Sequence, residues 1–238
     1  MSLVMSINAN EGLLIAADSM AVSSDPKTGS VIDKWFGARK LFVYKDNIVF
    51  GILGGSLYEC DIDGEHYKYN VQRILSIFKS ENPDLSAFEV PIKLLQFAKE
   101  KNLKVSTSSD IKGIIVVYAI DDYGNRMAAE VGITDNNITM HDCDLYTAFG
   151  ITRVVSAMIS SLELDHFKNL GLLQKIDLIK YCIEVTGNLD KFTHSMGVGG
   201  QVDVYFIVDP NKICPLYGSG WVQNKDVITI KDDSSDGE

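Results

Sequence analysis

The order of strand-like and helix-like patterns along the chain constrains the fold more than any other feature. Four short apolar runs typical of strands come first, at 4–7, 12–18, 40–44 and 47–51. Two consecutive stretches with helical spacing follow, near 66–80 and 86–101. The segment between the second and third strands, 19–34, is rich in Ser, Asp, Gly and Pro and predicts an irregular excursion.

The second half of the chain repeats this order. Strand patterns resume at 113–120, 127–133, 138–141 and 145–149. Two more helical patterns occupy roughly 152–166 and 171–187, and final strands are expected at 202–208 and 213–217. Because helices come in pairs instead of alternating singly with strands, a doubly wound parallel sheet is disfavoured. We predict an α+β fold of two stacked antiparallel sheets, with one pair of helices covering each outer face.

Length and composition fit one folded domain. The chain has 238 residues, 46% of them hydrophobic and 23% charged, so disorder as the main state is excluded. We predict a single domain over 1–230 and a mobile acidic tail over 231–238, which contains no apolar residue. The net charge of −10 argues against binding to nucleic acid.

The cysteines and the apolar runs bear on location. Four scattered cysteines without a C-x-x-C pair indicate free thiols in a reducing compartment: Cys60, Cys143, Cys182 and Cys214. No apolar run reaches the ~18 residues of a membrane span, and no basic segment precedes the first apolar run. We therefore predict a cytoplasmic protein that does not associate with membranes.

Several short motifs could suggest a ligand, and none has the full pattern. The glycine-rich stretches at 51–55 and 197–200 lack the features of phosphate-binding loops and predict tight turns. A calcium loop beginning at Asp61 would have His66 at its glycine position. The segment 141–144 alternates side-chain direction along a strand end, so its side chains cannot converge on one ion. No metal or cofactor is expected, and the tyrosines at 58, 67 and 69 are interpreted as helix packing.

Five segments in register resemble the proteasome β-type family of N-terminal nucleophile hydrolases, as a divergent, bacterial-like member. They are 12–19, 40–42, 49–55, 148–150 and 199–204, and the similarity covers most of residues 2–218. The resemblance implies a four-layer αββα sandwich, the fold of that hydrolase family. It also implies a peptidase without a cofactor that assembles into a homo-oligomeric ring and cleaves peptides or unfolded proteins.

The resemblance also assigns a candidate site. Asp18 matches the active-site aspartate, and Gly51 matches the glycine whose amide helps to form the oxyanion hole. The Lys-Leu-Phe motif selects Lys40 as the active-site lysine, whereas the usual spacing from the aspartate falls nearer Lys34; we favour Lys40. The N-terminal threonine of the family falls on Ser2.

A residue at the chain terminus suits this chemistry because one residue supplies two groups. Its hydroxyl is the nucleophile, and its free α-amine is the adjacent base. Ser2 becomes N-terminal only if Met1 is removed, and Met1-Ser2-Leu3 also resembles a vector-derived leader that replaces a native threonine. Two alternatives stay open: a catalytically silent proteasome-like subunit, in which Asp18 and Lys40 form only a structural ion pair, and an amide hydrolase of small molecules.

Overall fold

A computed structural model describes residues 2–24, 31–35, 37–106, 112–193, 197–208, 214–216, 220–222 and 227–231. Every strand pairing among these residues is antiparallel. The acidic tail predicted from residue 231 lies outside the described residues, except that Lys231 ends a strand.

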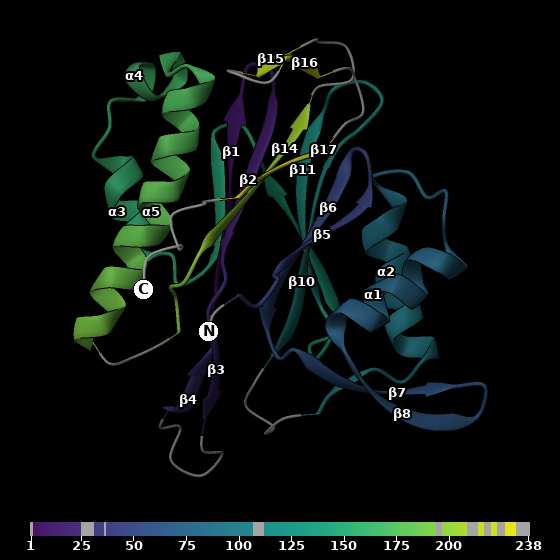
Figure 1. Cartoon of the computed structure of the whole chain (residues 1–238). Coiled ribbons are helices and arrows are strands. Elements are labelled where there is room, and N and C mark those ends of the chain that lie inside the picture. Colours follow the sequence, from purple (N-terminus) through teal and green to yellow (C-terminus); the bar gives the residue numbers. More distant parts are fainter. Residues whose placement is uncertain are drawn as a thin grey trace.

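Two five-stranded sheets form the centre of the molecule (Figure 1). The first sheet runs β13 (Tyr146–Gly150), β1 (Leu3–Ala9), β2 (Gly12–Asp18), β14 (Val202–Val208) and β17 (Val227–Lys231). The second runs β12 (Asn137–Asp142), β11 (Arg126–Gly132), β10 (Gly113–Ile120), β6 (Ile48–Gly54) and β5 (Leu41–Lys45). Hairpins and a meander account for the pairs β1–β2, β5–β6, β10–β11 and β11–β12. The remaining pairs, β13–β1, β2–β14, β14–β17 and β10–β6, join strands that are not consecutive in the sequence.

The described residues form five helices, which lie on the two sides of these sheets. Helices α3 (Arg153–Ser160), α4 (Leu164–Asn169) and α5 (Leu172–Thr193) lie on the side of the first sheet (Figure 1). Helices α1 (Val71–Glu81) and α2 (Glu89–Glu100) lie on the side of the second (Figure 1). The mixed α/β composition and the antiparallel pairing predicted from the sequence are therefore present.

Three clusters of buried apolar side chains hold these elements together. One lies between the first sheet and α3–α5, a second lies between the two sheets, and a third lies between the second sheet and α1–α2. Strand β1 shows how the alternation of a strand serves two clusters, because Leu3 and Met5 join the first cluster while Val4 joins the second. Each such fully buried side chain stabilises the fold by roughly 1.5–3 kcal/mol.

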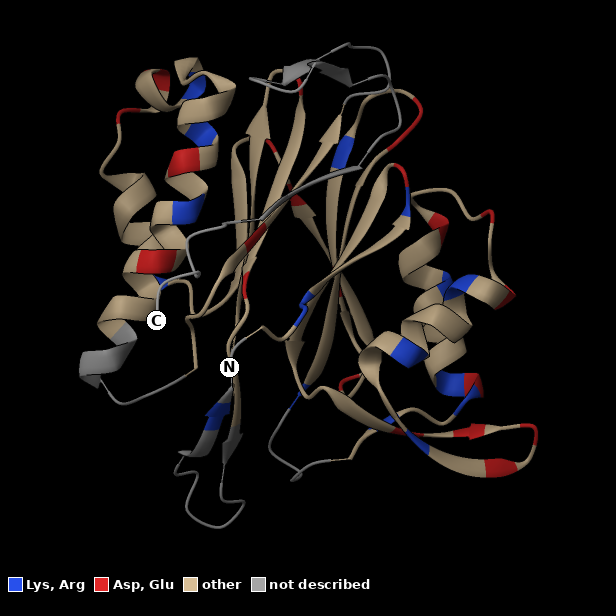
Figure 2. Ribbon diagram, viewed as in Figure 1, with Lys and Arg blue, Asp and Glu red and all other residues tan. Residues whose placement is uncertain are grey.

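Charged residues are concentrated on the helices, on the turns and on the hairpin of β7 (Leu57–Ile62) and β8 (Glu65–Asn70) (Figure 2). The strands of the two five-stranded sheets are mostly uncharged (Figure 2). A charged side chain buried at the end of a strand of these two sheets is therefore unusual in this molecule. No helix within the described ranges has the length and apolar character needed to cross a membrane.

Three element predictions were wrong. The helix expected from residue 66 begins only at Val71, because 65–70 form β8 (Glu65–Asn70), which pairs with β7 (Leu57–Ile62) and lies in one sheet with β9 (Lys104–Val105). Asn70 then caps α1 by accepting a hydrogen bond from the backbone N–H of Arg73 at 2.8 Å.

The tyrosines of this hairpin follow the period of a strand. Tyr67 and Tyr69 stack with ring centroids 5.3 Å apart, and both pack against the cluster below the second sheet. This cluster includes side chains of α1 and α2, so the packing role expected for the tyrosines agrees with the structure, although Tyr67 and Tyr69 lie on a strand.

The other two wrong predictions concern the segments 19–34 and 152–166. The excursion expected at 19–34 contains a hairpin, β3 (Ala21–Ser24) with β4 (Val31–Trp35), and the helix expected at 152–166 is divided into α3 and α4. Beyond the predicted strand at 213–217, observed as β15 (Cys214–Leu216), the chain adds β16 (Gly220–Val222) and β17.

Candidate active site

Asp18 is the last residue of β2, and the fold surrounds its carboxylate with donors. The side chain is 0% exposed. Its Oδ1 accepts a hydrogen bond from the backbone N–H of Leu3 at 2.9 Å. Its Oδ2 accepts from the backbone N–H groups of Met20 and Gly199, both at 3.2 Å, and forms an ion pair with Lys40. Three amides and one ammonium therefore compensate the buried negative charge.

Lys40 is the cation of this pair. It directly precedes β5, and its backbone carbonyl accepts a hydrogen bond from the N–H of Ile52 at 2.9 Å, which holds it beside β6. The Nζ atom lies 2.7 Å from Asp18 Oδ2, and the side chain is 8% exposed. Burial lowers the pKa of Lys40 below its ordinary value of 10.5, although the charge of Asp18 opposes this shift.

The ammonium of Lys40 has more N–H donors than it has acceptors among the described residues. It carries three N–H groups, and among the described residues its polar contact is the ion pair with Asp18, with no further acceptor in hydrogen-bond geometry. A buried, incompletely satisfied cation can interact with an additional electron-rich group placed next to it.

Lys34, the other lysine that the sequence left open, has a different environment. It is exposed and lies on β4, opposite Val22 of β3. The ion pair predicted between Asp18 and Lys40 is thus confirmed, and the structure favours Lys40 over Lys34 as the partner of Asp18.

Ser2 is buried, with 7% of its surface exposed. Its carbonyl accepts a hydrogen bond from the backbone N–H of Ile151 at 3.2 Å, while the following residue, Leu3, donates to Asp18. Gly150 approaches so closely that a Cβ built on it would lie 1.9 Å from the Ser2 carbonyl oxygen. Gly150 also has a φ of +93°, which favours glycine. The backbone of residue 2 is therefore fixed on both sides.

Gly51 lies inside β6, where it is paired with Leu41 on one side and Val116 on the other. A Cβ at this position would lie 2.7 Å from Val4 Cγ1 of β1, so close packing of the two sheets already requires a glycine here. The role of its amide in an oxyanion hole stays a prediction. Gly54, which ends β6 with a φ of +79°, is a second glycine of the same strand with a backbone suited to a turn.

Sequence reasoning missed the backbone groups that complete the site. The amides of Met20 and Gly199 and the contact of Gly150 with Ser2 carry no side-chain signature. The glycine pair at 199–200 belongs to one of the segments that carry the family resemblance. It is the one sequence feature that points to the contact from that loop to Asp18.

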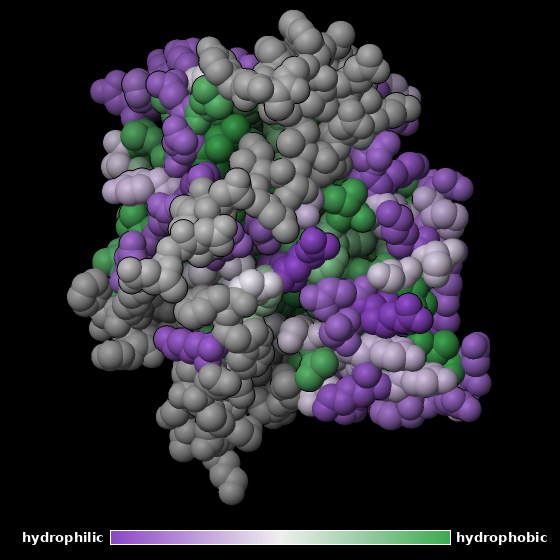
Figure 3. Space-filling view, in the orientation of Figure 1, coloured by the Kyte–Doolittle hydropathy of each residue, from purple (hydrophilic) through white to green (hydrophobic). Residues whose placement is uncertain are grey.

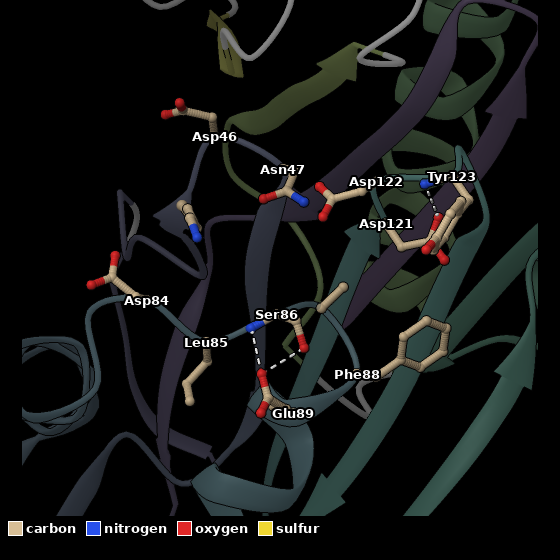
Figure 4. Close-up of a pocket in the computed structure, with 12 residues that line it drawn as sticks. Asp46, Asn47, Asp84, Leu85, Ser86, Phe88, Glu89, Asp121, Asp122 and Tyr123 are labelled. Atoms are coloured by element: carbon tan, nitrogen blue, oxygen red, sulfur yellow. Dashed lines mark hydrogen bonds between the residues drawn. The ribbon is translucent and has the colours of Figure 1, made fainter.

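A pocket of about 510 Å³ lies elsewhere, between the β5–β6 turn, the segment before α2 and the β10–β11 turn (Figure 4). Five carboxylates line this pocket, but two of them already accept hydrogen bonds from neighbouring residues. Glu89 accepts hydrogen bonds from the backbone N–H and the hydroxyl of Ser86, and Asp121 accepts from the backbone N–H of Tyr123 (Figure 4). Asp121 also accepts from the backbone N–H of Asn125. This pocket does not include Ser2, Asp18 or Lys40.

In the described part of the chain, no group of three or more His, Cys, Asp or Glu side chains has the geometry to hold a metal ion. Cys60, Cys143 and Cys182 are buried free thiols, while Cys214 lies among residues whose side chains are not described.

Comparison with known proteins identifies the fold. No known family model and no curated protein matches the sequence. Among solved structures, an Anbu (Gly-1) mutant from Hyphomicrobium sp. strain MC1 is similar, with a TM-score of 0.61 at 11% identity over 99% of this chain and 89% of that one. Anbu (ancestral beta-subunit) from Yersinia bercovieri has a TM-score of 0.60 at 14% identity, over 98% of this chain and 88% of that one. The chain has a proteasome-like fold.

The proteasome-like fold confirms the resemblance at the level of architecture. At identities of 11% and 14% it does not carry a catalytic role to individual residues. What the structure adds on its own is the arrangement at the ends of β1 and β2: a residue fixed at position 2, a buried carboxylate and a buried lysine.

Proposed function

We propose that the chain is a proteasome-like N-terminal nucleophile peptidase with a four-layer αββα arrangement over residues 1–230. The nucleophile is the hydroxyl of Ser2, or of a native threonine at that position. The observation that supports this proposal best is the buried Lys40–Asp18 pair, because Asp18 also binds the amide of Leu3, the residue after the candidate nucleophile.

The proposed reaction is acyl transfer through a covalent intermediate. The Ser2 Oγ attacks the substrate carbonyl while its proton passes to the free α-amine of the same residue. The amine then protonates the leaving nitrogen as the C–N bond breaks, which leaves an ester on Oγ. Water attacks this ester with the amine again as base, and releases the acid together with the regenerated hydroxyl.

The neighbouring groups have distinct roles in this proposal. The positive charge of Lys40 favours the less protonated forms of the Ser2 hydroxyl and amine. Asp18 orients Lys40 and fixes the start of β1. The amide of Gly51, or of Gly54 at the strand end, would stabilise the negative charge that develops on the carbonyl oxygen.

A ring of identical subunits and a cytoplasmic location complete the proposal. Large apolar side chains on or next to α2, α4 and α5 are exposed: Phe88, Ile92, Leu164, Leu173, Tyr181 and Leu189. On the face seen in Figure 3, hydrophobic residues form separate patches between hydrophilic ones. Such patches suit contacts with neighbouring copies, and a ring would restrict the site to peptides and unfolded proteins.

The alternative is a catalytically silent proteasome-like subunit with a structural or interaction role. The backbone contacts of Asp18 favour it, because three amides and a lysine can hold two sheets together without any chemistry. The two functions differ in one testable property. Only the peptidase needs a free α-amine on residue 2.

The test has two steps. Intact mass spectrometry of the native protein first shows whether residue 2 is N-terminal. The protein is then treated with a peptide epoxyketone, which bonds to a hydroxyl and an amine on the same residue, and turnover of fluorogenic peptides is measured. The peptidase predicts labelling confined to the N-terminal peptide. A free N-terminal residue 2 without labelling or turnover would favour the silent subunit.

Two lysine variants provide a matched comparison. Lys40→Met removes the buried cation, and Lys34→Met removes the exposed one on β4. We expect Lys40→Met to reduce the labelling rate by roughly 10²-fold or more, since it removes electrostatic support at the reacting centre. Lys34→Met should leave the rate within about twofold. Equal effects of both variants would contradict the assignment of Lys40.

A further inference from the structure

Gly187 lies in the interior of the long helix α5, where glycine destabilises a helix relative to alanine. Its surroundings explain why a larger residue is disfavoured. A Cβ built on Gly187 would lie 3.2 Å from both the Cα of Gly199 and the carbonyl oxygen of Val198. The backbone of α5 therefore packs directly on the loop that leads into β14.

The same loop holds Asp18. The backbone N–H of Gly199 donates a hydrogen bond to Asp18 Oδ2 at 3.2 Å, and its carbonyl accepts one from the N–H of Ser19 at 3.1 Å. Gly199 thus contacts the active-site candidate on one side and α5 on the other.

The distances make the hydrogen bond from Gly199 to Asp18 sensitive to small movements of the loop. The bond from Gly199 to Asp18 is already at the long end of the normal range for N–H···O bonds. A methyl group on Gly187 would have to push the loop or the helix by a few tenths of an ångström. If the loop moves, the amide of Gly199 leaves hydrogen-bond distance or loses its alignment.

From this geometry we infer that Gly187 is a positioning residue for the candidate active site. It lets α5 support the loop that carries Gly199, and the amide of Gly199 in turn orients the Asp18 carboxylate toward Lys40. The effect on catalysis rests on the proposed peptidase function, whereas the structural coupling from α5 to Asp18 does not.

The test uses Gly187→Ala in the full chain labelled with ¹⁵N-glycine. The chain has 19 glycines, and the Gly199 amide is assigned as the signal that both disappears in Gly199→Ala and shifts in Asp18→Asn. A hydrogen bond to a carboxylate moves an amide proton downfield. Gly187→Ala should therefore move the Gly199 proton upfield, by more than any glycine outside 197–200.

Gly171→Ala is the matched control. Gly171 directly precedes α5, and the nearest atom to a Cβ there is a side-chain oxygen of Gln174 at 3.7 Å. This variant should leave the Gly199 signal in place. If Gly187→Ala also leaves it in place, the helix has moved instead of the loop and the inference is wrong.

A second measurement covers the case in which Gly187→Ala does not fold. In the unmodified protein, hydrogen exchange of the Gly199 amide should follow the opening of α5 over a denaturant series. Exchange of Gly199 at much lower denaturant than the buried amides of α5 would overturn the coupling.

Activity provides the last readout. If the chain is a peptidase, Gly187→Ala should lower the epoxyketone labelling rate roughly fivefold, as expected for a weakened hydrogen bond to a charged group, and Gly171→Ala should not. A shifted Gly199 signal in a protein without peptidase activity would support the coupling and refute the proposed function. A shifted signal with an unchanged labelling rate would refute the positioning role.

Discussion

Replacing Asp18 with asparagine tests the energetics of the candidate site without changing its shape. The amide keeps one oxygen, which can accept from Leu3, but it places an NH₂ group where Oδ2 now accepts three donors. Lys40 then loses its anionic partner while remaining 8% exposed. We expect Asp18→Asn to fold with a large loss of stability that depends on pH.

The part of the loss that comes from Lys40 has an upper limit. An unpaired buried lysine can release its proton, and at pH 7 this costs about 1.4 kcal/mol for each of the 3.5 units below its ordinary pKa of 10.5, or about 5 kcal/mol. Removing one partner of a buried ion pair typically destabilises a protein by about 3–5 kcal/mol. The expected loss at pH 7 is therefore about 3–5 kcal/mol.

The sign of the pH dependence follows from proton binding. Burial lowers the pKa of Lys40, and the variant lacks the charge of Asp18 that opposes this shift. Between the lowered pKa and 10.5 the unfolded variant therefore binds more protons than the folded one. Stability of the variant then rises with pH. At pH 9, which is only 1.5 units below 10.5, releasing the proton of Lys40 costs about 2 kcal/mol. The difference in free energy of unfolding between the original protein and the variant should therefore be smaller at pH 9 than at pH 7.

The assay is urea unfolding at pH 7 and pH 9, at one fixed protomer concentration because assembly affects apparent stability. The double variant Asp18→Asn with Lys40→Met should recover part of the loss, since it leaves no unpaired charge. A loss below about 1 kcal/mol at pH 7, or a loss that does not change with pH, would refute the reasoning that the pair is buried and mutually dependent.

Three further predictions concern other parts of the molecule. Burial raises the pKa of the Cys143 thiol to about 12 and that of Cys182 to about 11 from an ordinary 9.0, so each thiol should cost about 1.4 kcal/mol of stability per pH unit above 9. Cys182→Ala should flatten this alkaline slope in urea unfolding, and an unchanged slope would contradict it. Gly150→Ala should abolish epoxyketone labelling of residue 2, because its Cβ would collide with the Ser2 carbonyl; normal labelling would show that residue 2 is not held there. Light scattering should give a multiple of 26.3 kDa, and a monomer mass that persists across salt concentrations would contradict ring assembly.

Local patterns predicted most of the central strands because each has a clear alternation or a fully buried apolar run. Strands β2, β10 and β14 have the expected boundaries. The predicted start of α1 is too early because Tyr67 lies four residues before Val71, as on one helix face, while Tyr67 and Tyr69 also have the alternation of a strand. Only pairing with β7 decides between the two. Tertiary pairing of this kind is not visible in a single sequence.

The candidate site was predictable only in part, for a related reason. Asp18 and Lys40 could be located only because the segments around them, 12–19 and 40–42, resemble motifs of the proteasome β-type family. The amide donors of Leu3, Met20 and Gly199 could not, since every residue except proline has such a group and only the fold brings three of them to one carboxylate.

Most of the contacts around residue 2 and Asp18 come from backbone groups. The backbone N–H of Ile151 donates a hydrogen bond to the carbonyl of Ser2 at 3.2 Å. The side chain of Ile151 instead packs against the cluster between the first sheet and its helices. A backbone contact survives replacement of the side chain as long as the path of the chain is kept. At this site that path depends on Gly150 next to residue 2 and on Gly199 next to Asp18, so substitutions at these glycines should disturb the geometry more than many changes of the surrounding side chains.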